Sequence, residues 1–302
     1  MYLFIIIACI FIISAIWLWV KLEGSLWPKK STLAFWRLSN LSPDKKLEGY
    51  FYAARADWYL KPVTWSWFMR RFVKNESPDT YHGKVMTRPD AVKLVSLKQP
   101  LELTELEHVV PYPLARSIIL QDPLPSLAVM ECPCRAQKVD ACLPRDVCLV
   151  MGEPFTSFIV EHQPERARRI TVDEALQIIA EEEERGHIHT AWFKDAMHNR
   201  FYTICNCCSC CCLGMGSMSR GVKRLAHSGY SPLVDRDVCI SCGSCASICP
   251  FTAVSISAEL PEFATDQCMG CGLCVSHCLV GAITLILTPQ MGTPLNIENL
   301  LP

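Results

Sequence analysis

The strongest hydrophobic pattern lies at the N-terminus, where the nineteen residues 2–20 carry no charge. At 1.5 Å per residue, a helix of that length spans about 28 Å, close to the thickness of a bilayer's hydrocarbon core. Trp17 and Trp19 lie at the C-terminal end of this run, where interfacial aromatic residues are typical. The pattern predicts a transmembrane anchor at residues 1–20.

A cleaved signal peptide is the alternative for this run. It would need a positively charged start and a cleavage site between small residues. Residues 1–4 carry no charged side chain and residues 18–22 offer no such site, so a retained anchor is favoured. Four basic residues follow the run: Lys21, Lys29, Lys30 and Arg37. The positive-inside rule then predicts a single-pass protein of the cytoplasmic membrane whose C-terminal bulk is cytoplasmic.

Residues 21–80 are predicted to be a juxtamembrane segment rich in aromatic and basic residues. Within it, residues 45–72 combine Trp58, Trp65 and Trp67 with Arg70 and Arg71. Such a stretch could lie on the lipid headgroups, with its aromatic side chains inserted. It could equally pack its aromatic face on the rest of the chain or on a partner protein.

From residue 81 the pattern becomes that of a globular α/β region. Apolar spacing predicts helices at 90–97 and 112–121 and a strand at 126–130. Thr171 and Glu174 form a capping box in front of an apolar helical stripe, which predicts a helix that ends near Gly186. Residues 190–204 contain strand-like segments. We predict a cysteine-rich α/β domain at 81–228.

Composition adds two constraints. The 302 residues carry 29 basic and 30 acidic side chains, and the net charge of −1 gives no electrostatic case for a nucleic-acid partner. Nineteen cysteines indicate either disulfides or metal, and the odd total argues against complete disulfide pairing. Clustered thiols that bind metal favour a reducing compartment, and hence the cytoplasm.

The C-terminal part repeats one cysteine motif. The spacing C-x2-C-x2-C-x3-C occurs twice, at Cys239, Cys242, Cys245, Cys249 and at Cys268, Cys271, Cys274, Cys278. This spacing is typical of [4Fe–4S] ligation, in which the fourth cysteine of each run binds the other cluster. It predicts one cluster at Cys239, Cys242, Cys245 and Cys278, and a second at Cys268, Cys271, Cys274 and Cys249. A zinc ribbon is the alternative, but eight cysteines exceed what one zinc ion needs.

Residues 233–287 resemble the bacterial two-cluster ferredoxins, a resemblance that implies a pseudo-twofold βαββαβ fold. The sequence therefore predicts an α+β protein with an N-terminal transmembrane helix, the central α/β domain and a C-terminal ferredoxin-like module at 229–302. One departure from the repeat is Leu279, which stands where the first run has Pro250.

Ten further cysteines lie upstream, in two groups: Cys132, Cys134, Cys142 and Cys148, and then Cys205, Cys207, Cys208, Cys210, Cys211 and Cys212. Neighbouring thiols without a ligand oxidise readily, so these strings favour metal binding. Since adjacent side chains diverge, residues 205–212 either give a subset of their thiols to one cluster or divide between two. Ten thiols suffice for two more [4Fe–4S] clusters, with two thiols unused.

Other ligations remain open at these upstream thiols. Zinc could occupy residues 132–148, and a dinuclear or non-cubane centre could occupy residues 205–212. Arg135 could donate a charge-assisted hydrogen bond to a cluster sulfur, or it could form a surface salt bridge.

From residue 81 onward, the CPCR motif, the CNCCSCCC string and the tandem runs together resemble multi-cluster 4Fe–4S proteins of anaerobic bacteria. The resemblance implies iron–sulfur electron transfer in an anaerobic setting and does not supply a partner or a substrate. The cysteine count predicts at least two [4Fe–4S] clusters, and three or four if the upstream thiols bind them. No Rossmann or Walker fingerprint occurs, so we expect a membrane-anchored electron-transfer protein that serves a partner oxidoreductase. A reductase with an unusual cluster at residues 205–212, or a metal-handling protein, is the alternative.

Overall fold

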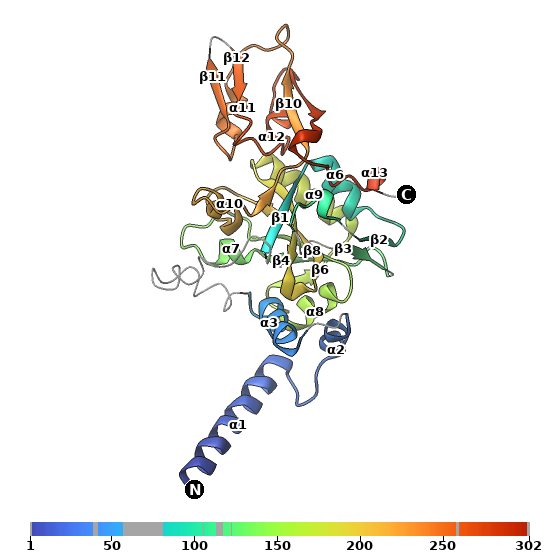
Figure 1. Ribbon diagram of the computed structural model, residues 1–302, viewed down its shortest axis with the longest axis vertical. Helices are drawn as coiled ribbons and strands as arrows, with labels where there is room; N and C mark the ends of the chain where they lie inside the picture. Colours follow the sequence, from blue (N-terminus) through green and yellow to red (C-terminus); the bar gives the residue numbers. More distant parts are fainter. Residues whose placement is uncertain are drawn as a thin grey trace.

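The computed structural model describes residues 2–38, 42–56, 81–104, 106–112, 117–121, 123–257 and 260–300. Figure 1 shows three parts along the long axis of the molecule: an N-terminal helix, a central sheet with its covering helices, and a C-terminal pair of small sheets. Residues 57–80, which include most of the predicted aromatic and basic stretch, lie outside the described residues.

Within the described residues, nine strands form the central sheet, and the order along its main path is β6-β4-β5-β8-β7-β1-β9. Strand β3 joins this path through β8, and β2 pairs with β3. Neighbours along the path are antiparallel, except that β9 is parallel to β1. The strands are β1 (Tyr81–Met86), β2 (Leu101–Thr104), β3 (Ser117–Leu120), β4 (Leu127–Glu131), β5 (Asp146–Met151), β6 (Ala167–Arg169), β7 (Ile188–Lys194), β8 (Arg200–Cys207) and β9 (Leu225–Ala226).

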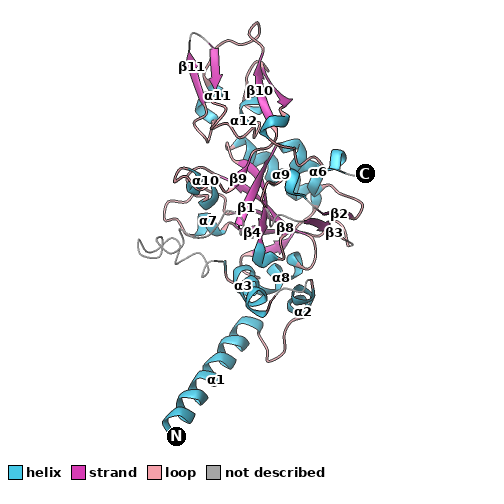
Figure 2. Cartoon of the chain, in the orientation of Figure 1, coloured by secondary structure: helices cyan, strands magenta, loops and turns pink. Residues whose placement is uncertain are grey.

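Helices cover both faces of this sheet, as Figure 2 shows in cyan around the magenta strands. Besides the strands, the part from the N-terminus to residue 218 contains α1 (Tyr2–Glu23), α2 (Lys30–Arg37), α3 (Pro43–Ala54), α6 (Arg88–Val95), η1 (Leu106–His108), α7 (Pro133–Ala136), α8 (Phe155–His162), α9 (Val172–Glu184), η2 (Asp195–Met197) and α10 (Leu213–Met218). The predicted helix at 112–121 is wrong over β3, because its apolar residues pair with β2 instead of forming a helical stripe.

Two hydrophobic cores lie on opposite faces of the sheet. Side chains from α6 and α9 fill one face, where they pack on Leu149 and Phe193. On the other face, α2, α3 and α8 pack on Trp192 and Tyr202. Successive strand residues point to opposite faces, so Leu149 joins the first core while its neighbour Cys148 joins the second. The second core therefore receives the upstream thiols.

Among the residues that the structure describes, no helix combines enough length with enough apolar character to cross a membrane. The predicted transmembrane anchor at residues 1–20 is therefore wrong. The prediction of a single-pass protein of the cytoplasmic membrane depended on that anchor and falls with it.

Contacts with the protein fix the C-terminal end of α1. The Glu23 carboxylate is buried and accepts hydrogen bonds from the Tyr50 hydroxyl at 2.6 Å and from Thr32 Oγ1 at 3.0 Å, and it pairs with His162 Nε2 at 2.9 Å. Burial alone would raise the pKa of Glu23, but these hydrogen bonds hold it below its ordinary value. The junction between α1 and the α2–α3–α8 layer is thus built around one carboxylate.

The C-terminal part contains two small antiparallel sheets and two short helices. Its elements are β10 (Tyr230–Val234), α11 (Ser244–Ile248), β11 (Val254–Ser257), β12 (Leu260–Phe263), α12 (Leu273–Ser276) and β13 (Ile283–Leu287). They follow the order β-α-β-β-α-β, with β10 paired to β13 and β11 to β12. The chain then returns through η3 (Pro289–Met291) and α13 (Ile297–Leu300), which places Leu295 and Ile297 in the core under α6 and α9. The whole is an α+β protein.

Candidate metal centres

Each cysteine run of the C-terminal module turns sharply between its second and third cysteine. Gly243 and Gly272 stand at these turns with φ of 77° and 90°, a backbone conformation that glycine adopts without steric penalty. Each glycine precedes a short helix whose first turn carries the third cysteine, Cys245 in α11 and Cys274 in α12. The repeat in sequence is therefore a repeat in backbone geometry.

The second run closes around a cavity of about 20 Å³ with an apolar lining. Cys268, Cys271 and Cys274 line it, and they are joined there by Cys249, the last cysteine of the first run. Burial raises the pKa of the Cys271 thiol, so a thiolate at this position needs a nearby positive charge such as a metal ion. The cavity brings together the four residues that the motif predicts for the second cluster.

Fewer contacts describe the other four cysteines of the module, which are Cys239, Cys242, Cys245 and Cys278. Cys245 lies within electrostatic reach of Cys239 and Cys242, and Cys278 follows α12 in the other half of the repeat. Two matching backbone donors point at the fourth cysteines, from Ala253 N to Cys249 Sγ at 3.3 Å and from Ala282 N to Cys278 Sγ at 3.2 Å. Hydrogen bonds of this kind tune the potential of a cluster. The assignment of Cys278 to the first cluster stays a prediction.

Four upstream thiols form a compact group, which we call the four-thiol group: Cys142, Cys208, Cys210 and Cys211. Their sulfur atoms all lie within 4.8 Å of one another, with Cys142 Sγ 3.2 Å from Cys208 Sγ and Cys210 Sγ 3.5 Å from Cys211 Sγ. Four convergent thiols suit either a tetrahedral metal ion or an iron–sulfur cluster. The group joins loops that are 66 residues apart in sequence.

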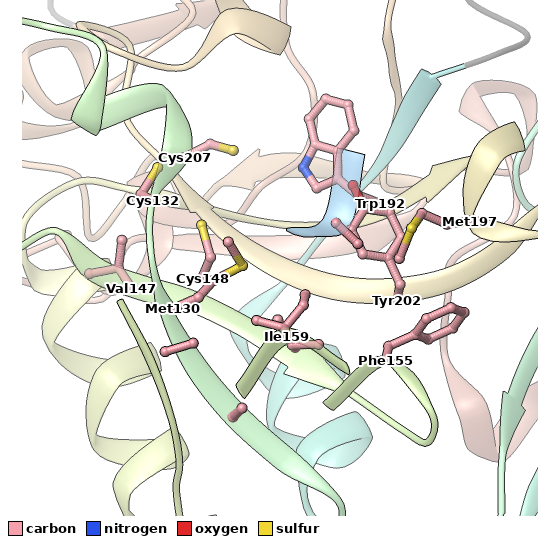
Figure 3. Close-up of a cluster of buried hydrophobic side chains, with 14 of the residues drawn as sticks. Met130, Cys132, Val147, Cys148, Phe155, Ile159, Trp192, Met197, Tyr202 and Cys207 are labelled. Carbon is pink, nitrogen blue, oxygen red and sulfur yellow. The ribbon is translucent and has the colours of Figure 1, made fainter. Parts of the chain in front are cut away.

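The other six upstream thiols form a closed arrangement, which we call the six-thiol ring. Each thiol lies beside two others, in the order Cys132, Cys134, Cys212, Cys207, Cys205, Cys148 and back to Cys132. All six line one cavity of about 50 Å³. Figure 3 shows Cys132, Cys148 and Cys207 beside the buried core residues Met130 and Val147.

Local backbone geometry divides the cysteine string between these two sites. β8 ends at Cys207, so Cys205 and Cys207 share one face of the sheet and belong to the six-thiol ring. The chain then turns, and Cys208, Cys210 and Cys211 belong to the four-thiol group. Cys212 returns to the six-thiol ring as the residue before α10. The thiols of the string therefore divide between the two groups; that both groups bind a cluster stays a prediction.

Aromatic side chains form one wall of the same cavity: Tyr52, Tyr81, Trp192 and Tyr202. The Tyr52 and Tyr202 hydroxyls lie 2.6 Å apart, and the Tyr81 ring stacks on Trp192 with centroids 4.4 Å apart. Burial raises the pKa of Tyr52, so its hydroxyl keeps its proton. The sequence analysis missed these residues. A register shift in the pairing of β8 with β7 brings Tyr202 to the thiol-bearing face, and no sequence pattern signals it.

Thr190 and Arg135 connect the six-thiol ring to its surroundings. Thr190 Oγ1 lies 3.3 Å from Cys207 Sγ and accepts a hydrogen bond from Trp192 Nε1 at 2.7 Å. Arg135 is fully buried, and its Nη2 pairs with Glu182 at 2.5 Å. A surface salt bridge at Arg135 is therefore excluded.

The guanidinium of Arg135 has one donor still available. Its other nitrogens bond to Glu182, to His187 Nδ1, and to the backbone carbonyls of Pro144 and Asn206. Within the described residues, Nε is buried without a hydrogen-bond partner. Burial would raise the pKa of Glu182, but hydrogen bonds to His187 and Arg135 keep it low, so the pair stays ionised. The guanidinium lies within electrostatic reach of Cys132, Cys142 and Cys208, so its buried Nε–H could donate to an inorganic sulfide bound at these thiols.

Comparison with known proteins identifies the C-terminal module. The profile of the 4Fe-4S dicluster domain matches residues 232–285, the segment that holds both tandem runs. No curated protein matches the chain. The matched domain and the clustered upstream thiols together define the class: this is an iron–sulfur protein with multiple [4Fe–4S] clusters.

Proposed function

We propose that this chain is an electron-transfer protein in which the dicluster module exchanges electrons with a metal centre at the upstream thiols. The chemistry that such clusters supply is one-electron transfer, and the protein adjusts their potential through burial and hydrogen bonds to sulfur. The proposal keeps the sequence expectation of a relay and leaves out the membrane anchor.

One observation carries the proposal: the dicluster module and the six-thiol ring share a hydrophobic core. Met269, Leu273 and Phe251 of the module pack in the same core as Cys132, Cys148 and Cys207. Ser228 Oγ donates to the Gly270 carbonyl at 2.7 Å, and His277 Nε2 lies 3.3 Å from the carbonyl oxygen of Glu184, at the end of α9. A packed junction holds two redox sites at a fixed separation, which electron exchange requires.

A partner oxidoreductase supplies or removes the electrons. The sequence has no Rossmann or Walker fingerprint, so a built-in nicotinamide or nucleotide site has no support. The thiol of Cys242, a predicted ligand of the first cluster, is exposed, so a partner would approach the module on this side. The closeness of the motifs to multi-cluster proteins of anaerobic bacteria supports an anaerobic setting for this reaction.

The test removes one cluster from the module. In the full chain, purified without oxygen, Cys245→Ala should abolish one [4Fe–4S] signal in the EPR spectrum of the reduced protein. The upstream centre should keep its spectrum but should be reduced more slowly by a low-potential ferredoxin in stopped-flow absorbance. Cys9→Ala, at an exposed thiol in α1, is the matched control. Reduction of the upstream centre at the wild-type rate would refute the relay.

A reductase is the second candidate, and the cavity at the six-thiol ring favours it. That cavity offers phenol hydroxyls beside a cysteine site, an arrangement in which electrons and protons could reach one substrate. Addition of a disulfide such as oxidised glutathione to the reduced protein tests this alternative. A change in the EPR spectrum of the upstream centre, with thiol release, would favour a reductase over a relay.

A further inference from the structure

The six-thiol ring contains more thiols than one cubane cluster uses. A [4Fe–4S] cluster takes four cysteine ligands, whereas the cavity is lined by all six thiols of the ring and also by Cys208 of the four-thiol group. We propose that all six bind one polynuclear iron–sulfur centre that is larger than a single cubane. The inference rests on the proposed function only in placing iron–sulfur chemistry at the upstream thiols.

The closed order of the contacts is the first argument. All six thiols of the ring line the same cavity and each lies beside two others, so no subset of four is set apart from the remaining two. The four-thiol group is different, because its sulfur atoms all lie within 4.8 Å of one another. If the ring bound a cluster through only four of its thiols, those four sulfur atoms should lie equally close together, and the other two thiols should lie outside them.

The origin of the ligands along the chain is the second argument. Cys148, Cys132 and Cys134 follow one another around the six-thiol ring, and all come from the segment that contains β4, α7 and β5. The opposite half of the ring comes from one short string: Cys205, Cys207 and Cys212. Two segments thus present three thiols each across one cavity, which suits a centre with two equivalent halves.

Hydrogen-bond donors on both halves support the same assignment. Backbone N–H groups of Arg135 and Met215 reach the sulfurs of Cys132 and Cys212. Such donors stabilise thiolates and tune the metal that they bind. Because one such donor reaches a thiol from each of the two segments, both segments take part in the site.

The division of the ten upstream thiols is the third argument. Six belong to the ring and four to the compact group, so every upstream thiol has a site. The sequence analysis expected two cubanes with two thiols unused. In the structure, each of the ten thiols belongs to one of the two groups. The ring therefore contains two thiols more than a cubane cluster uses.

The experiment is a cysteine scan of the full chain, purified without oxygen. Each of the six ring cysteines is replaced singly by alanine, and Cys210→Ala in the four-thiol group is the matched control. Iron and acid-labile sulfide per chain are measured together with Mössbauer and EPR spectra. We expect all six variants to alter the same upstream signal and to lose more than about four irons, the content of one cubane, while Cys210→Ala keeps that signal.

Two outcomes would overturn the proposal. If two of the six substitutions leave iron content and spectra at the wild-type level, the ring binds one cubane and has two bystanders. If none of the six changes the iron content, the ring binds no iron. The [4Fe–4S] signals of the dicluster module report correct folding in every variant, and a serine variant replaces any alanine variant in which they are lost. Failure of the proposed electron relay gives a different result. The upstream centre is then reduced at the wild-type rate in Cys245→Ala, while the iron content of the ring stays unchanged.

Discussion

Replacement of Arg135 by methionine tests how the upstream region is held together. The Arg135 guanidinium and the Glu182 carboxylate are 0% and 1% exposed and lie 2.5 Å apart. Breaking a buried ion pair costs about 3–5 kcal/mol when the remaining charge has no other partner; Glu182 would keep its contacts with His187 and Arg185, so the cost should lie at the lower end of this range. For a domain of this size, 1 kcal/mol corresponds to roughly 2–4 °C in the unfolding midpoint, so Arg135→Met should lower it by an amount near the lower end of about 6–20 °C.

The assay is thermal unfolding followed by far-UV circular dichroism, without oxygen and at one scan rate for all variants. Arg168→Met is the matched control, because Arg168 pairs with Glu174 at the surface and is 58% exposed. Exposed pairs contribute less than about 1 kcal/mol, so this control should move the midpoint by a few degrees at most.

A double variant separates the loss of the pair from the burial of a lone charge. Arg135→Met combined with Glu182→Met removes both charges and should recover part of the lost stability, because an apolar pair can replace a buried ion pair. A midpoint for Arg135→Met within 2 °C of the wild type would refute the reasoning. A double variant no more stable than Arg135→Met would show that the bonds to backbone carbonyls, and not the ion pair, stabilise this region.

Three further predictions concern other sites. A Cβ atom at Gly214 would lie 2.4 Å from the Trp192 ring, so Gly214→Ala should lower the free energy of unfolding by about 1–3 kcal/mol, whereas Gly216→Ala should not. Burial lowers the pKa of His198 from 6.5 to about 4. The unfolded chain therefore binds a proton at His198 more tightly than the folded protein does, and the free energy of unfolding should fall as the pH drops from 6.5 towards 4. In urea titrations, His198→Gln should weaken this pH dependence. Glu23→Gln weakens charge-assisted hydrogen bonds at the end of α1 and should lower the free energy of unfolding by about 1.5–3 kcal/mol in urea; an unchanged midpoint would contradict the packing described there.

The sequence best predicts the features that depend on the spacing of residues close together in the chain. The tandem runs identify the dicluster module because three thiols at i, i+3 and i+6 need only one turn of chain to converge. Helix α9 follows from Thr171, whose side chain accepts a hydrogen bond from the Glu174 backbone at 3.2 Å as the capping box requires. In both cases the residues that decide the structure lie within one or two turns of each other.

The features that sequence could not predict depend on distant contacts. The apolar run over Ser117–Leu120 becomes β3 only because β2 is available to pair with it. Cys142 reaches Cys208 because β5, which follows Cys142, pairs antiparallel with β8, which precedes Cys208. Tyr202 faces the thiols because of a register shift against β7. The charge-free run at residues 2–20 predicted a membrane anchor, whereas no helix among the described residues is long and apolar enough to cross a membrane.

The four-thiol group also links distant parts of the chain. Cys142 and Cys208 are 66 residues apart, and a metal bound by both acts as a cross-link that restricts the unfolded chain. By the loop-entropy relation used for disulfides, closing a loop of that length disfavours the unfolded state by about 4 kcal/mol. Loss of the metal, through oxygen or a chelator, would therefore remove redox capacity and mechanical cohesion together.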